Sequence, residues 1–186
     1  MLPLPETLVT AHGDGAAVAN TTSQTSLLSA QARQVVPTGA LDRAGAQIWL
    51  RAAGRMSNIV TTPGTLTLEL KYGSVVVASS GALSLNVVAK TNTGWWLDWM
   101  LTLRDPGAAA TLMHQGFFKS HSVIGSPAPT AGGAGVHLIP YNAAPAVGTA
   151  FDSKAAQILD LCATWSIANS GNSIQLHQYA PLFVMG

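Results

Sequence analysis

The stretch Gly94-Trp95-Trp96-Leu97-Asp98-Trp99-Met100-Leu101-Thr102-Leu103-Arg104 alternates between two sets of side chains. The first set is apolar throughout and consists of Trp95, Leu97, Trp99, Leu101 and Leu103. The second set is mixed and consists of Trp96, Asp98, Met100, Thr102 and Arg104. A period of two is typical of a β-strand with one buried face, so Trp95 and Trp99 are predicted to anchor a core. Trp96 points the other way, and we expect it to be buried against a second subunit.

Similar alternation extends in both directions from this stretch. Residues 64–72 place Leu66, Leu68, Leu70 and Tyr72 on one face, and residues 159–167 do the same with Leu159, Leu161, Ala163, Trp165 and Ile167. Further strands are predicted at 47–53, 56–61, 74–79, 83–89, 112–119, 136–139 and 173–179. Helix signals are poor: 153–157 favours a single turn, and 26–36 has modest helical propensity. Many short strands without a fixed repeat predict an all-β protein, an antiparallel β-sandwich or jelly roll.

The length of 186 residues fits one domain with a sizeable core. We place a single β-sandwich domain at 41–186, after a long irregular N-terminal arm at 1–40 that is weakly periodic. A long Pro/Gly loop is predicted at 125–149, with prolines at Pro127, Pro129, Pro140 and Pro145. A loop longer than about 12–15 residues inside a compact domain is usually functional or disordered. The arm and this loop are therefore our candidates for contacts with other chains.

The composition is poor in charge. Charged residues make up 9% of the chain and hydrophobic residues 48%, whereas a typical soluble domain has about 25% charged residues. Disorder and a membrane-spanning helix are both disfavoured, and the first residues lack the features of a signal peptide. The net charge of +1 and the scattered basic residues argue against nucleic-acid binding. A weakly charged surface favours packing against other proteins, although an abundance of small uncharged residues would give the same composition.

The residue types that carry chemistry form no recognised motif. The histidines His12, His114, His121, His137 and His177 lack metal-ligand spacing, and no GxSxG sequence is present. The single cysteine, Cys162, lies in an apolar run and is predicted to be buried. A hydrolase could use Asp98 and Asp160 if their carboxyl groups lay roughly 5–10 Å apart. We predict no enzyme, no cofactor and no metal site.

The sequence GSPAPTAGGAG at residues 125–135 is uncharged and rich in glycine and proline. Phosphate-binding loops need a lysine and the start of a helix after the glycines, and neither follows Gly135. Too few strands come afterwards for this stretch to link a second domain. We therefore expect the loop to contact another protein chain. The candidate interface residues are Trp96, Pro127, Pro129, Gly132, Gly133, Pro140 and Tyr141.

Four segments resemble small β-rich proteins encoded among the virion structural genes of tailed bacteriophages. They are GRMSNIVTTPGTL (54–66), SPAPTAGG (126–133), FDSKAAQ (151–157) and NSIQLHQY (172–179), within a resemblance that runs from about residue 45 to about residue 180. The resemblance implies a virion component and supplies no catalytic residues, and among virion roles we favour a capsid decoration, or cement, protein. Such a protein is expected to be a homo-oligomer, a trimer, on the capsid surface and to bridge major capsid protein subunits. The alternative is a carbohydrate- or receptor-binding module of a tail or fibre, and neither a nucleic acid nor a membrane is predicted as partner.

Overall fold

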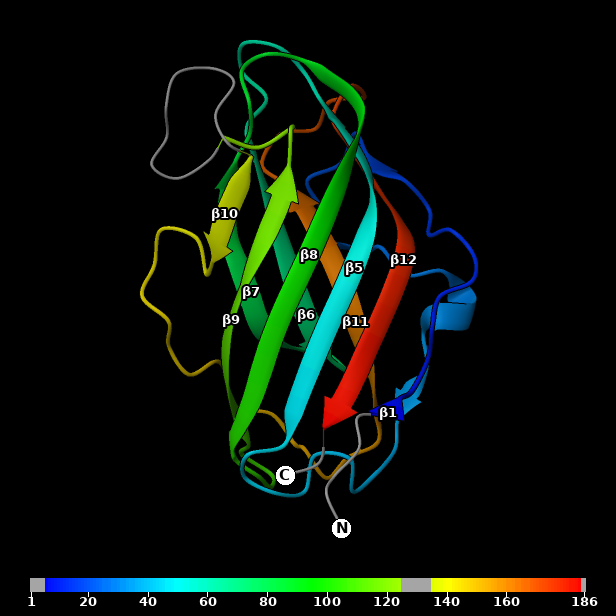
Figure 1. Cartoon of the computed structure of the whole chain (residues 1–186), viewed down its shortest axis with the longest axis vertical. Helices are drawn as coiled ribbons and strands as arrows, with labels where there is room; N and C mark the ends of the chain where they lie inside the picture. Colours follow the sequence, from blue (N-terminus) through cyan, green and yellow to red (C-terminus); the bar gives the residue numbers. More distant parts are fainter. Residues whose placement is uncertain (1–5, 125–134, 185–186) are drawn as a thin grey trace.

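The computed structural model describes residues 6–124 and 135–184, which form two antiparallel β-sheets over one hydrophobic core (Figure 1). The seven-stranded sheet has the order β1 (Glu6–Thr7), β12 (Ser173–Val184), β5 (Gln47–Asn58), β8 (Lys90–Asp105), β9 (Thr111–Ser120) and β10 (Val136–Ile139), and β2 (Val18–Ala19) also pairs with β12. The five-stranded sheet has the order β3 (Thr25–Ser26), β11 (Gln157–Trp165), β6 (Thr65–Tyr72) and β7 (Val75–Ser84), and β4 (Val35–Val36) pairs with β11. The prediction of an all-β protein with antiparallel strands is confirmed.

Two pairs of predicted strands are continuous in the structure. Residues 47–53 and the first half of 56–61 form the single strand β5, and β7 joins 74–79 to the start of 83–89. The apolar pattern of β5 breaks at Gly54, where a Cβ would collide with the carbonyl oxygen of Gln175 in β12, so the strand continues without a side chain there. Jelly-roll connectivity is not confirmed, because β6 and β7 form a hairpin and β8, β9 and β10 pair in sequence order.

The core is built from the inward faces that the alternation predicts. Trp95, Leu97, Trp99, Leu101 and Leu103 of β8 are all buried, and Leu66, Leu68, Leu70 and Tyr72 of β6 face them from the other sheet. Burying one such apolar side chain contributes roughly 1.5–3 kcal/mol. The buried indole nitrogens also have partners: Trp99 Nε1 donates to His114 Nδ1 at 3.2 Å, and Trp165 Nε1 donates to the Val18 carbonyl at 3.0 Å. The predicted anchoring role of Trp95 and Trp99 is therefore confirmed.

The N-terminal segment is not confirmed as an arm. Residues 6–19 lie along the free edge of β12, through β1, β2 and the hydrogen bond from Ala11 N to Tyr179 O at 3.0 Å. The chain then crosses to the other sheet, where β3 and β4 pair with the edge of β11. Its buried apolar side chains, Val18, Leu27, Leu28, Ala32 and Val36, belong to the core. The segment therefore covers one side of the sandwich, shown in blue on the right of Figure 1.

The weak helix signals give no α-helix in the described residues. The segment 26–36 contains only a single 3₁₀ turn, Ala30–Ala32, because its flanks pair with β11. Within 153–157, residues 153–155 form a turn and Gln157 begins β11. The backbone N–H of Lys154 donates to Asp152 Oδ1 at 2.9 Å, a bond that favours a turn over a helix. Across the described ranges, no helix has the length and apolarity that a membrane crossing would require.

The opposite side of the sandwich is covered by residues 135–151. Within this stretch, β10 extends the seven-stranded sheet as predicted, and Val147 and Phe151 make single bridges to β9 and the residue before it. The backbone N–H of Tyr141 donates to Ser80 O of β7 at 2.6 Å, so the segment also reaches the smaller sheet. Residues 125–134 of the predicted loop lie outside the described part of the chain. This segment thus covers part of the β9 edge and meets β7 through a backbone hydrogen bond.

Candidate interaction face

The outer face of the seven-stranded sheet carries large apolar side chains that the described chain leaves uncovered. Half of the ten exposed large hydrophobic residues lie there: Trp49 (41% exposed), Trp96 (42%), Met100 (44%), Phe117 (36%) and Leu138 (74%). They come from the four adjacent strands β5, β8, β9 and β10, and Figure 1 looks directly onto this sheet. We call these five residues, with the side chains between them, the apolar face. Clustered Trp, Phe and Met are typical of protein interfaces.

The strand register brings these residues together in rows. In one row, Trp49 lies opposite Met100 on one side and opposite Leu182 on the other. In the row two residues further along, Arg51 lies opposite Asp98, Asp98 opposite Phe117, and Phe117 opposite Leu138. In the third row, Ala53 lies opposite Trp96, and Trp96 opposite Lys119. Because side chains directly opposite each other are about 5 Å apart at their Cβ atoms, the apolar face is one continuous surface.

An ion pair lies at the centre of the apolar face. Arg51 Nε is 3.3 Å from Asp98 Oδ2, and their side chains are 54% and 34% exposed. An exposed pair of this kind contributes about 0–1 kcal/mol to stability, so the fold does not depend on it. Lys119 is the only other charge in the three rows. The centre of the face therefore carries one positive and one negative charge side by side, with aromatic side chains on both sides.

Trp96 separates two hollows on this face. One hollow, of about 300 Å³, includes Arg51, Ala53, Gln178 and Ala180 in its lining. Its depth follows from the small side chains of the two alanines beside the large indole of Trp96. The other hollow, of about 370 Å³, lies between Trp96 and a rim that includes Lys119 and His121. The face therefore carries a projecting apolar side chain, Trp96, and hollows beside it that are large enough to receive another apolar side chain.

The predicted interface residues do not lie together in the described part of the structure. Trp96 is exposed on the outer face of β8, as its place in the alternation predicts. Pro140 and Tyr141 are half-buried at the end of β10, and the Tyr141 ring packs edge-on against buried His137 at a centroid distance of 4.1 Å. Tyr141 thus makes a contact within the chain, and the structure does not bring it to the apolar face. Four further candidates lie outside the described residues: Pro127, Pro129, Gly132 and Gly133.

Four members of the apolar face were missed by the sequence reasoning: Trp49, Met100, Phe117 and Leu138. The signal for Trp49 and Met100 was present, because each lies between buried residues of an alternating strand. Their assembly into one surface depends on the register between β5 and β8, which local alternation does not determine.

The carboxylate pair required for a hydrolase is not formed. Asp98 lies on the outer face of the seven-stranded sheet and pairs with Arg51. Asp160 lies on the outer face of the five-stranded sheet and accepts a hydrogen bond from Ser26 Oγ. The hydrophobic core separates the two side chains, so they cannot act on one glycosidic bond.

The remaining titratable residues show no site for a metal or for thiol chemistry within residues 6–124 and 135–184. No group of three His, Cys, Asp or Glu side chains has the arrangement of a metal site there. Cys162 is buried, as predicted, and burial together with the Asp160 charge raises its pKa to about 12. Burial also lowers the pKa of His114, which accepts the Trp99 hydrogen bond in its neutral form. Burial thus disfavours the charged forms of both groups.

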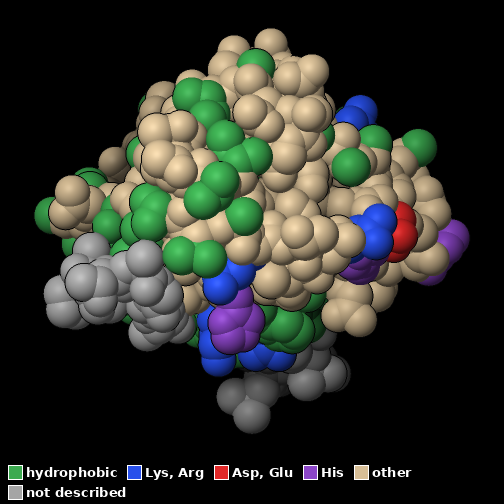
Figure 2. Space-filling model, turned by 90° about the horizontal axis from the view of Figure 1, so that it is seen from above, with side chains coloured by type: hydrophobic (Ala, Val, Ile, Leu, Met, Phe, Trp, Pro, Cys, Tyr) green, Lys and Arg blue, Asp and Glu red, His purple; other side chains and the backbone are tan. Residues whose placement is uncertain are grey.

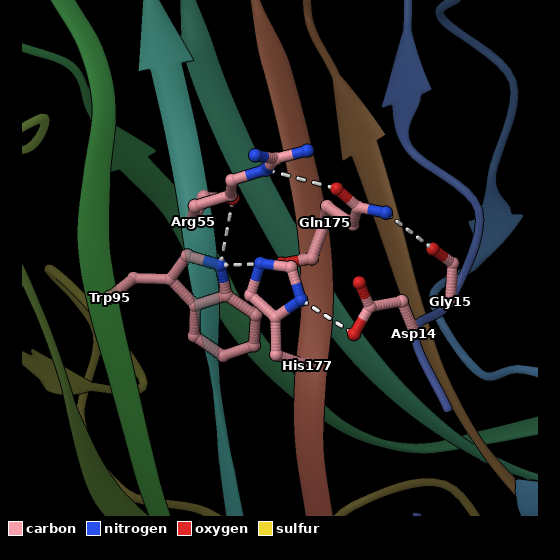
Figure 3. Close-up of polar contacts among 6 residues, drawn as sticks. All are labelled: Asp14, Gly15, Arg55, Trp95, Gln175 and His177. Atoms are coloured by element: carbon pink, nitrogen blue, oxygen red, sulfur yellow. Dashed lines mark hydrogen bonds and ion pairs between the residues drawn. The ribbon is translucent and has the colours of Figure 1, made fainter. Parts of the chain in front are cut away.

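A polar cluster fastens the N-terminal segment to β12 (Figure 3). Asp14 Oδ1 is 2.7 Å from His177 Nδ1, and Gln175 Nε2 donates to the Gly15 carbonyl at 3.0 Å. Gln175 Oε1 in turn accepts from Arg55 Nε at 3.0 Å. A His–Asp pair can serve a nucleophile, but none of the residues in this cluster offers a hydroxyl or a thiol. The cluster therefore joins β5 and β12 to the N-terminal segment, and we assign it a structural role.

The chain was also compared with known proteins. No family model, curated protein or solved structure matches it. The functional assignment therefore rests on the apolar face and on the chemistry of its side chains, since a sandwich fold alone is compatible with many functions.

Proposed function

We propose that this protein is a structural component of a tailed-phage virion, a capsid decoration protein that forms homo-oligomers and bridges major capsid subunits on the capsid surface. The observation that carries the proposal is the apolar face, a broad surface of aromatic and aliphatic side chains that the described chain does not cover. Monomeric proteins rarely expose such patches, so a protein partner is the simplest reason for it. The family resemblance and the low charge of the chain point in the same direction.

A second surface suits contact with the shell. At the end of the sandwich where β5 meets the loop before β8, Val60 (60% exposed), Val87 and Val88 project outward. The buried amide of Asn58 fixes these loops by donating to Asn86 O at 2.6 Å and to Val88 O at 3.1 Å. Figure 2 looks onto this end and shows apolar and uncharged side chains over most of it, with most charged side chains in its lower and right-hand parts. A rigid, uncharged end can bind a repeating protein lattice without electrostatic selectivity.

The test measures how much of the protein binds to phage heads that were prepared without it. Purified wild-type protein and a Val60→Asp/Val88→Asp double variant are mixed with such heads, and the bound protein is quantified after sedimentation. We expect saturable binding of the wild type and at least about tenfold weaker binding of the variant, because each buried carboxylate is strongly disfavoured. Val35→Asp is the matched control, since Val35 is a 50% exposed valine of β4 that lies on neither surface. Absence of wild-type binding contradicts the proposal.

A carbohydrate- or receptor-binding module of a tail or fibre is the second candidate. The observation that favours it is the pair of exposed tryptophans, Trp49 and Trp96, on one sheet face, with Arg51 and Gln178 lining the hollow beside Trp96. Aromatic rings stack on sugars, and polar side chains at the rim give selectivity. A glycan array with the isolated protein tests this candidate. Sugar binding that is abolished by Trp96→Ala supports it, and an array without signal contradicts it.

A further inference from the structure

We infer that the apolar face binds the apolar face of a second copy of the same chain, about a two-fold axis that runs parallel to the strands between β5 and β8. This inference names the partner of the surface on which the proposed function rests. In such a pair, each residue of β5 lies opposite the residue of the partner's β8 that is already its neighbour within the chain. The register of β5 and β8 therefore specifies which side chains meet.

The charges at the centre of the face are self-complementary in this arrangement. Arg51 and Asp98 are cross-strand neighbours within one chain. The two-fold rotation exchanges their positions, so Arg51 meets Asp98 of the partner subunit and Asp98 meets Arg51 of the partner subunit. Four charges then form an alternating square, which satisfies both signs when water is removed.

The other in-plane two-fold axis, which runs across the strands through the same pair, fails this requirement. It would bring Arg51 against Arg51 of the partner subunit and Asp98 against Asp98 of the partner subunit. Like charges facing each other in an interface core are strongly unfavourable. The ion pair thus selects the axis that is parallel to the strands.

The sizes of the side chains match under the same rotation. Trp96 of one copy lies over Ala53 of the other, because these residues are cross-strand neighbours. Ala53 and Ala180 line the hollow of about 300 Å³ beside Trp96, so each copy presents a projecting indole and a space to receive one. Four residues away along the strands, on the other side of the ion pair, Trp49 meets Met100 of the partner subunit, and thioether–aromatic contacts are favourable.

The area of the face is close to what a stable dimer needs. The axis exchanges β5 with β8 and β12 with β9. These four strands, spaced about 4.8 Å apart, with nine residues of β5 rising about 3.3 Å each, give a projected area of roughly 570 Å², to which β10 adds beyond β9. A standard interface buries about 800 Å² on each partner. Stacked sheets in proteins keep their strand directions within about 30° of each other, which the proposed axis allows.

The experiment measures the molar mass of the full chain in solution, by light scattering and by sedimentation equilibrium, for charge variants of the face. We expect the wild type to have twice the chain's 19.2 kDa. Arg51→Asp alone and Asp98→Arg alone should each raise the dimer dissociation constant at least about tenfold, because like charges then meet across the axis. An equimolar mixture of these two variants should recover the dimer as a heterodimer, and the double variant Arg51→Asp/Asp98→Arg should recover it alone.

The size match has its own variant and control. Ala53→Trp fills the hollow that would receive the indole of the partner subunit and should also weaken the dimer at least about tenfold. Ala82→Trp is the matched control, since Ala82 is an exposed alanine of β7 on the other sheet. Circular dichroism and tryptophan fluorescence establish that each variant is folded, and the recovery in the mixture does not depend on either variant being unchanged in stability.

Several outcomes overturn the inference. A monomeric wild type, a wild-type trimer of the kind expected from the sequence, or a dimer that is unaffected by all three single substitutions would each exclude this pairing. These masses are measured without phage heads. A failure of the dimer therefore leaves head occupancy as an independent test of the proposed function.

Discussion

The outer faces of the two sheets differ, although both sheets cover the same core. On the five-stranded sheet, Thr67, Glu69 and Lys71 of β6 point outward, and Asp160 of β11 lies opposite Lys71. Among the described residues, none of the exposed large hydrophobic side chains lies on β6, β7 or β11. On the seven-stranded sheet, the corresponding positions carry the apolar face.

This difference between the two outer faces distinguishes side chains that the fold requires from side chains that it does not. An antiparallel sandwich needs apolar side chains on its inner faces only, and a solvated outer face is the usual arrangement. The five-stranded sheet follows that arrangement. The apolar face adds surface that lowers solubility without contributing to the core, which is why we attribute it to binding.

The largest expected effect is on the free energy of unfolding, and it compares substitutions on the inner and outer faces of the seven-stranded sheet. Trp99→Ala should lower the free energy of unfolding by about 3–5 kcal/mol, because it opens a cavity and leaves the His114 ring without its donor. Trp49→Ala, on the outer face, should lower it by about 1 kcal/mol or less. Urea unfolding followed by circular dichroism at low protein concentration measures both. Equal losses would mean that Trp49 is part of the folding core.

The second prediction contrasts the two outer faces. Trp96→Ala should raise the dissociation constant of the dimer about 30-fold, corresponding to about 2 kcal/mol, because Trp96 is a central aromatic anchor of the interface. Thr67→Ala, on the outer face of the smaller sheet, should leave the constant unchanged. Sedimentation equilibrium provides both values. A larger effect of Thr67→Ala than of Trp96→Ala would place the interface on the five-stranded sheet.

The third prediction concerns pH and the inner face of the larger sheet. Burial lowers the pKa of His114 on β9 and of His137 on β10 below the ordinary value of 6.5. The unfolded chain therefore binds more protons than the folded chain as the pH falls below 6.5, so stability is full above that pH and decreases below it. Unfolding free energies measured from about pH 7.5 down to about pH 5 should decrease.

A histidine variant isolates this effect from the carboxylates. His137→Phe keeps an aromatic ring against Tyr141 and should reduce the loss of stability on acidification. His12→Gln, a change at an exposed histidine, should not alter it. If acidification stabilises the wild type, buried neutral histidines are not what controls its pH dependence.

The last prediction concerns the reactivity of the single cysteine, Cys162, which lies in β11. Because burial raises the pKa of Cys162 to about 12, its thiol should be protonated at neutral pH. Alkylation by iodoacetamide should be at least about 100-fold slower in the folded protein than in urea. Mass spectrometry of timed samples gives the rates. Rapid alkylation of the folded protein would show that Cys162 is not kept buried in solution.

The sequence predicted the inner faces well, because each is encoded by local alternation. The inward residues of β8 and β6 can be identified within a single stretch of about ten residues. The pairing of Arg51 with Asp98 could not be identified in that way, since it depends on a register between strands 47 residues apart. The apolar face follows from the same register, so only Trp96 was selected in advance.

The arm predicted for the N-terminal segment is not confirmed, for a different physical reason. It pairs with the edges of β11 and β12 through backbone groups in pieces of two residues, and such pairing leaves little periodicity in the side chains. Its buried residues, such as Leu27 and Val36, are also separated by irregular spacing. Low periodicity therefore indicated an arm, whereas the backbone hydrogen bonds show that the segment covers the edges of β11 and β12. We call this segment the edge cover.

The edge cover has a consequence for synthesis of the chain. The strands β1–β4 find their partners in β11 and β12, which are synthesised much later than they are. The hydrogen bond from Trp165 to Val18, for example, spans 147 positions. Until those strands emerge, the N-terminal segment has nowhere to pair, and the hydrophobic side chains it carries stay accessible to chaperones. Closure over such separations is slow, so we expect the native sandwich to form only after β11 and β12 have emerged from the ribosome.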